Sequence, residues 1–112
     1  RAIASVDVGW LAAAAPPAAR LVDLAGVTDP EIAALPGGHT SKRVDATILL
    51  DRGVDVVLVW APRGEAGGPG RVVEARLVAS ELFRRRYEAR SFLPLGAAGG
   101  GYVVYRRRPP EP

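Results

Sequence analysis

Five polar residues hold positions at which a small protein of strands and helices could bind a ligand: Asp7, Asp23, Asp29, His39 and Lys42. Asp7 and Asp23 each stand at the end of a short apolar run that is typical of a strand. Open α/β sheets bind ligands beyond the carboxyl ends of their strands, so these two carboxylates predict a polar pair at a ligand crevice. The alternative is that each carboxylate accepts hydrogen bonds from backbone N–H groups in the following turn.

His39 and Lys42 lie close together in one glycine-flanked loop, residues 38–43. They could supply a general base and an anion contact, or belong to a solvated loop. His39 is the only histidine and the chain has no cysteine, which excludes multi-histidine metal sites, cysteine zinc sites and disulfides. The glycine stretches at 67–70 and 99–101 do not match phosphate-binding loops. We therefore expect no metal and no cofactor.

Two arginine triplets, residues 84–86 and 106–108, could contact anionic lipid head groups or nucleic acid, or form a solvated face. The chain has 15 basic and 12 acidic residues, a net charge of +3, and Lys42 is its only lysine. Asparagine and glutamine are absent, a composition typical of a GC-rich genome. Base composition thus accounts for part of the arginine excess, and we expect no nucleic-acid partner.

The strands that would position these residues are short. Apolar runs at residues 2–8, 20–24 and 55–60 predict three strands, and the continuous run of the third is typical of a central strand covered on both faces. Residues 87–95 and 102–107 predict an antiparallel hairpin across a glycine-rich turn. Helical crossovers between the early strands imply that those strands pair in parallel.

Capping residues predict the helices. Either Thr28 or Asp29 could cap a short helix that has Pro30 at its first position. Asp45 and Ser80 suit the starts of two further short helices. Residues 10–15 could add a helical turn or two, and residues 71–78 fit a strand or a helix equally well. The sequence therefore predicts a small layered α/β domain, with a mixed, partly parallel sheet flanked by short helices and a C-terminal hairpin.

The length of 112 residues fits one domain, which we place at residues 1–108, with a tail at 109–112. The chain opens on Arg1 and contains no methionine, so we expect a fragment of a longer protein or a processed product. No apolar run reaches the ~18 residues expected of a membrane span.

An ordered set of short motifs resembles a group of bacterial membrane enzymes. Residues 21–33, LVDLAGVTDPEIA, resemble a segment that reads hydrophobic-Asp-Leu-x-Gly-Leu-Thr-Asp-x-x-Ile-Ala. The segment follows an Asp-x-Gly at residues 7–9 and precedes a Gly-His-x-x-Lys loop at 38–42 and a strand at 54–58. Residues 80–87, SELFRRRY, extend the match. The set resembles the arabinofuranosyltransferase-like and mannosyltransferase-like members of the C-type glycosyltransferase superfamily.

In that family a many-helix membrane domain carries the catalytic carboxylate and precedes a soluble α/β domain outside the cytoplasm. The resemblance implies a non-catalytic accessory domain of a glycosyltransferase with a polyprenyl-phosphate sugar donor. It implies a place on the extracytoplasmic (periplasmic) face of the bacterial inner membrane, with the membrane domain of the same polypeptide and a lipid-linked sugar as partners. The five polar residues would bind substrate or dock on the membrane domain. The alternative is a stand-alone small-ligand or nucleotide-binding α/β module.

Overall fold

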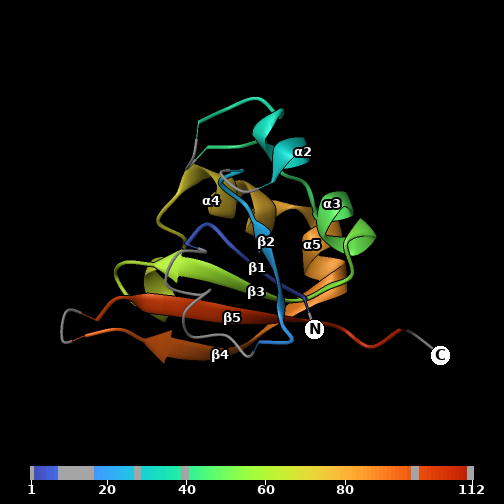
Figure 1. Cartoon of the computed structure of the whole chain (residues 1–112). Helices are drawn as coiled ribbons and strands as arrows, with labels where there is room; N and C mark the ends of the chain where they lie inside the picture. The colour runs from blue at the N-terminus through green and yellow to red at the C-terminus, as the bar shows by residue number, and fades with distance from the viewer. Residues whose placement is uncertain (1, 8–16, 27–28, 39–40, 97–98, 111–112) are drawn as a thin grey trace.

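The computed structural model describes residues 2–7, 17–26, 29–38, 41–96 and 99–110. These residues form a five-stranded mixed sheet in the order β2-β1-β3-β5-β4 (Figure 1). β1 pairs in parallel with β2 and with β3, and β5 pairs antiparallel with β4, as the sequence predicted. β5 also pairs antiparallel with β3, a pairing that the sequence did not predict. The strands are β1 (Ala2–Ser5), β2 (Arg20–Asp23), β3 (Val54–Ala61), β4 (Tyr87–Pro94) and β5 (Gly101–Arg107).

Short helices start where side chains cap them. Asp29, Asp45 and Ser80 each accept a hydrogen bond from a backbone N–H two or three residues on, which satisfies a donor that has no partner within the helix. Residues 71–78, which fitted either state, lie mainly in a helix, and the turn predicted at 10–15 falls outside the described residues. The helices are α2 (Pro30–Ala33), α3 (Ala46–Asp51), the 3₁₀ turn η1 (Glu65–Gly67), α4 (Val72–Ala79) and α5 (Glu81–Arg86).

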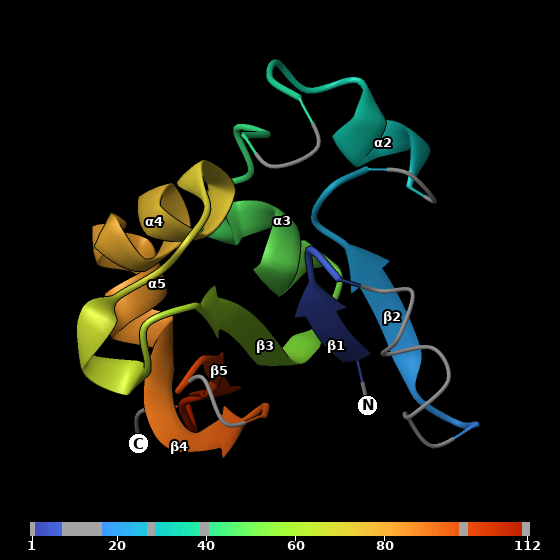
Figure 2. The same cartoon turned by 90° about the vertical axis from the view of Figure 1, so that its left-hand side faces the viewer.

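The main core lies between one face of the sheet and the α-helices, which gather on that side (Figure 2). Leu49, Leu77 and Phe83, one each from α3, α4 and α5, are completely or almost completely buried there. Val56 and Leu58 of β3 belong to a smaller buried cluster on the opposite face. β3 is therefore covered on both faces, which confirms the central strand predicted from its apolar run.

Two strands end earlier than their apolar runs suggested. β1 stops at Ser5 rather than at residue 8, because the Ser5 hydroxyl accepts a 3.0 Å hydrogen bond from the backbone N–H of Asp7. β2 stops at Asp23 rather than at Leu24, where the Asp23 carboxylate accepts a 2.9 Å bond from Ala25. Both side chains offer the backbone a partner outside the sheet ladder, and the chain turns at that point.

The pairing register assigns each functional residue to one end of the sheet. The carboxyl ends of β1, β2 and β3 lie at one end, where Trp60 of β3 pairs with Tyr102 of β5. At the other end Val56 pairs with Arg106, so the last residues of β5 lie beside the beginning of β3. Asp7 and the arginine triplets therefore belong to opposite ends of the sheet.

Candidate functional site

A surface hollow of about 440 Å³ lies at the carboxyl end of β1 and β3. Its residues come from separate parts of the chain: the segment after β1, the end of β3, the residue before α4, the segment after β4 and the start of β5. We call it the Asp7 hollow; its lining residues are Asp7, Trp60, Arg71, Leu95 and Tyr102. Its position matches the place where open α/β sheets bind ligands.

Asp7 is the centre of the polar contacts in this hollow. Its Oδ2 atom accepts a 2.8 Å bond from Nη1 of Arg71 and a short hydrogen bond from the Tyr102 hydroxyl. Both partners of the ion pair are about one quarter exposed, so solvent screens the pair only in part. Burial lowers the pKa of Arg71, but the hydrogen bond and charge of Asp7, together with the charge of Glu74, raise it above its ordinary value.

Aromatic rings form the apolar part of the Asp7 hollow. The Trp60 and Tyr102 rings lie 5.2 Å apart between centroids and are tilted by 54°. The guanidinium carbon of Arg71 lies 5.8 Å from the centroid of the Trp60 ring, within the range of a cation–π contact. Arg71 is thus held between a carboxylate and an aromatic face, which fixes the direction of its remaining donors.

Glu74 of α4 supports the hollow from the interior. Its side chain is completely buried, and its Oε2 atom accepts a 2.7 Å hydrogen bond from the backbone N–H of Trp60. Oε1 lies 3.9 Å from Nη1 of Arg71 and has no hydrogen-bond partner among the described residues. Burial raises the pKa of Glu74 to about 7, against the opposing effects of the Trp60 hydrogen bond and the charge of Arg71.

Comparisons with known proteins found no matching family model, no matching curated protein and no matching solved structure. In the part of the chain that the structure describes, no helix is long and apolar enough to cross a membrane. Over the same residues, no group of three or more histidine, cysteine, aspartate or glutamate side chains could hold a metal ion. Evidence on function therefore comes from the motifs of this chain and from the geometry of its side chains.

The structure places the five residues predicted from sequence in different settings. Asp7 lies in the hollow described above. Asp23, at the end of the neighbouring strand, is 2% exposed and accepts the backbone N–H of Ala25, which is the turn-forming role given as its alternative. His39 lies outside the described residues.

The remaining two residues hold α2 in place. Asp29 caps the beginning of α2 and forms an ion pair with Arg52, the residue after α3. The ammonium group of Lys42 donates to the carbonyl oxygens of Ala33, the last residue of the same helix, and of Leu35 just after it, at 2.8 and 3.0 Å. These contacts give Asp29 and Lys42 structural partners at opposite ends of α2.

Sequence reasoning missed four lining residues of the hollow, Trp60, Arg71, Leu95 and Tyr102. It also missed Glu74, which is buried beside the hollow. One signal could have found Trp60, because it stands near the carboxyl end of a third parallel strand, the same criterion that selected Asp7 and Asp23. Arg71 and Glu74 lie in the segment whose state the sequence left open. The residue pattern of that segment does not show whether it is a helix, so it does not predict that either side chain lies near Asp7.

Proposed function

We propose that this chain is a non-catalytic accessory domain of a membrane-bound glycosyltransferase that uses a polyprenyl-phosphate sugar donor, and that the Asp7 hollow binds a sugar. The ordered motifs of residues 7–9, 21–33 and 38–42 support the family part of this proposal. The proposal includes the extracytoplasmic location and the membrane-domain partner that those motifs imply. The observation that supports sugar binding is the joint position of Asp7, Arg71 and Tyr102 beside the ring of Trp60.

The chemistry of the hollow suits a polyhydroxylated ring. A sugar offers pairs of hydroxyl groups to charged acceptors and donors, and an apolar face of C–H groups to an aromatic ring. Oδ1 of Asp7 makes no hydrogen bond within the described residues, so it can accept from a hydroxyl group. Arg71 donates to Asp7 through Nη1, which leaves other N–H donors for ring or hydroxyl oxygens. Trp60 supplies the aromatic face.

The sugar part is tested by titration of the 112-residue chain with methyl α-D-mannopyranoside and with methyl α-D-arabinofuranoside. We follow the indole N–H signal of Trp60 in ¹H–¹⁵N NMR spectra and expect saturable shifts. Asp7→Asn should weaken binding by about tenfold, the effect of one lost charged hydrogen bond. Asp51→Asn, an exposed residue of α3, is the matched control and should bind as the wild type does. Absence of saturation with both glycosides would contradict sugar binding.

The accessory-domain part is tested on the parent gene. An open reading frame that continues upstream of Arg1 into many apolar segments of ~20 residues supports it. The Asp7→Asn substitution in that full-length enzyme should then lower glycosyl transfer while expression stays unchanged. A parent protein without such segments contradicts the membrane-enzyme proposal. Sugar binding by the Asp7 hollow is still tested by the titration.

The second candidate function is a stand-alone small-ligand or nucleotide-binding module. The location of the hollow at the carboxyl ends of parallel strands favours it, because nucleotides bind α/β sheets at that edge. AMP, GMP and UMP in the same NMR titration distinguish the two functions. Saturation by a nucleotide, together with no response to either glycoside, would support the module and contradict sugar binding by the Asp7 hollow.

A further inference from the structure

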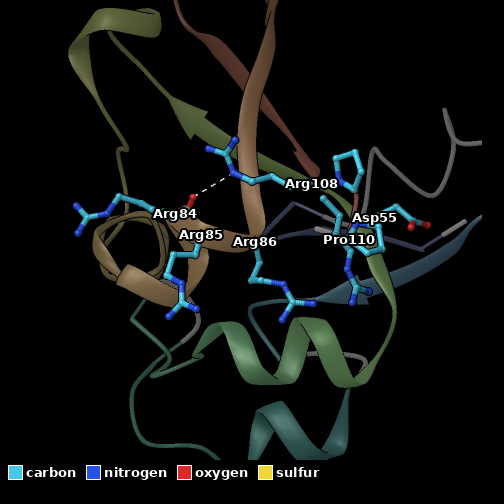
Figure 3. Close-up of a pocket in the computed structure, with 8 residues that line it drawn as sticks. Asp55, Arg84, Arg85, Arg86, Arg108 and Pro110 are labelled. Atoms are coloured by element: carbon cyan, nitrogen blue, oxygen red, sulfur yellow. Dashed lines mark hydrogen bonds between the residues drawn. The ribbon is translucent and has the colours of Figure 1, made fainter. Parts of the chain in front are cut away.

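A second and larger pocket, of about 800 Å³, lies at the opposite end of the sheet from the Asp7 hollow. It opens between the last turn of α5 and the end of β5, segments about twenty residues apart in the sequence. We call it the arginine pocket; Figure 3 shows its lining residues, Asp55, Arg84, Arg85, Arg86, Arg107, Arg108, Pro109 and Pro110. Five of the six arginines of the two triplets therefore line one pocket, and Arg106 does not.

Hydrogen bonds join the two sides of the arginine pocket. The backbone N–H of Arg108 donates to the carbonyl oxygen of Arg86 at 2.8 Å, and Nε of Arg108 donates to the carbonyl oxygen of Arg84 at 3.3 Å (Figure 3). Both acceptors lie at the C-terminal end of α5, where carbonyl groups lack helical partners. Pro109 and Pro110 follow, and their rings restrict the backbone of the outer wall. One backbone and one side-chain hydrogen bond therefore hold the two sides of the pocket together.

The positive charge in this pocket is poorly neutralised. Arg108 forms an ion pair with Glu88 at 3.0 Å. The side chains of Arg84, Arg85, Arg86 and Arg107 form no ion pair with any described residue. Among the residues that the structure describes, Asp55 is the only acidic one in the lining. The negative end of α5 offsets part of the repulsion among its three arginines, but a bound anion would offset far more.

Guanidinium groups are well suited to bind oxyanions such as phosphate. Each presents a planar set of donors that matches two phosphate oxygens, and several around one pocket suit a ligand with more than one negative charge. In Figure 3 the side chain of Arg86 extends toward α3, whereas Arg84 and Arg85 spread along the outside of α5. This spread suits adjacent phosphate groups, or a phosphate at a charged surface, better than one small anion.

We propose that the arginine pocket binds a phosphate group of a polyanionic ligand through Arg86 of α5 and Arg107 of β5, one from each side of the pocket. The phosphate could belong to a free diphosphate compound or to the head group of an anionic lipid, and the two sources share this chemistry. This site is separate from the Asp7 hollow, so its existence does not depend on sugar binding.

The experiment measures binding of inorganic pyrophosphate to the 112-residue chain by calorimetry at ~150 mM salt, where non-specific attraction is screened. A second arm measures co-sedimentation with phosphatidylcholine vesicles, with and without phosphatidylglycerol. The pocket variant is Arg86→Gln with Arg107→Gln, which removes two side chains that form no ion pair with the part of the chain that the structure describes. The matched control is Arg43→Gln with Arg63→Gln, two exposed arginines outside the pocket. Thermal melting confirms that both variants fold.

We expect one equivalent of pyrophosphate to bind, with affinity reduced about tenfold or more in the pocket variant and less than about twofold in the control. If the chain binds phosphatidylglycerol vesicles but not pyrophosphate, and the pocket variant loses the vesicle binding, the phosphate belongs to a lipid head group.

Failure of the folded wild type to bind either probe would overturn the proposal. An equal loss in the two double variants would also overturn it, because net charge alone would then explain the attraction. Pocket-dependent binding of a single-stranded DNA oligonucleotide alone would replace it with a nucleic-acid site.

Discussion

The backbone N–H of Trp60 donates a 2.7 Å hydrogen bond to Oε2 of Glu74, a carboxyl group that is completely buried. The bond joins the end of β3 to the first turn of α4 directly beneath the Asp7 hollow. It also holds an ionisable group away from water, beside Arg71 and within the electrostatic influence of Asp7. The stability of the fold and the charge state of the hollow are therefore coupled through one side chain.

Glu74 should make stability fall as pH rises. Because burial raises its pKa from 4.5 to about 7, the folded chain keeps this proton at pH values where the unfolded chain has lost it. The free energy of unfolding therefore decreases between those pKa values, by up to about 3 kcal/mol, and the loss persists at higher pH. Glu74→Gln carries no charge, so its unfolding free energy should lack this decrease. Urea unfolding at pH 5 and pH 8 measures the difference.

The matched control for Glu74 is Glu81→Gln, an exposed carboxylate in the first turn of α5. It should keep the pH dependence of the wild type. If Glu74→Gln showed the same pH slope as wild type, the carboxyl group would not be the source of the effect.

Tyr87 should stabilise the start of β4 through its hydroxyl group. The hydroxyl donates a 2.7 Å hydrogen bond to the carbonyl oxygen of Val54, and both residues are buried. Tyr87→Phe keeps the ring, which stacks on Phe83, but leaves that carbonyl oxygen without this partner. We expect a loss of about 1–3 kcal/mol in the free energy of unfolding. The comparison is Tyr105→Phe, whose hydroxyl has no hydrogen-bond partner among the described residues, and an equal loss in both variants would refute this role.

Lys42 should act on stability more than on binding. Its ammonium group donates to two carbonyl oxygens, of Ala33 and Leu35, and the residue is only 9% exposed. Lys42→Met keeps most of the aliphatic stem and removes both bonds, which should cost about 1–3 kcal/mol. Thermal unfolding measures the loss, with exposed Arg43→Met as control. A stable Lys42→Met variant that no longer binds sugar would instead place Lys42 in the binding site.

Gly26 should tolerate no side chain. Its φ of +78° lies in the left-handed region, and a Cβ atom there would come within 2.8 Å of the backbone of Ala33 in α2. Gly68 has the same φ of +78° but no atom within 4 Å of such a Cβ. Gly68→Ala should therefore lose only the conformational penalty of about 1–2 kcal/mol, and Gly26→Ala distinctly more. Equal melting temperatures for the two variants would show that α2 moves away from Gly26 without cost.

Local signals predicted the elements well because the interactions that define them are short in sequence. Asp29, Asp45 and Ser80 each cap a helix through a hydrogen bond to a residue two or three positions on. The apolar run of β3 needed only its own residues to indicate a strand covered on both faces. Strand ends were less certain, since Ser5 and Asp23 form side-chain bonds that an apolar pattern does not contain.

The sequence alone determined most of the strands and helices, the parallel pairing of the early strands, the antiparallel C-terminal hairpin and the position of Asp7 just after a strand. Only the tertiary structure decided which residues meet there: Arg71 and Tyr102 lie 64 and 95 positions from Asp7 along the chain. Their meeting depends on the strand order β1-β3-β5 and on the turn by which α4 follows β3. These are long-range relationships, set by how the sheet and helices bury their apolar faces together, and no local residue pattern encodes them.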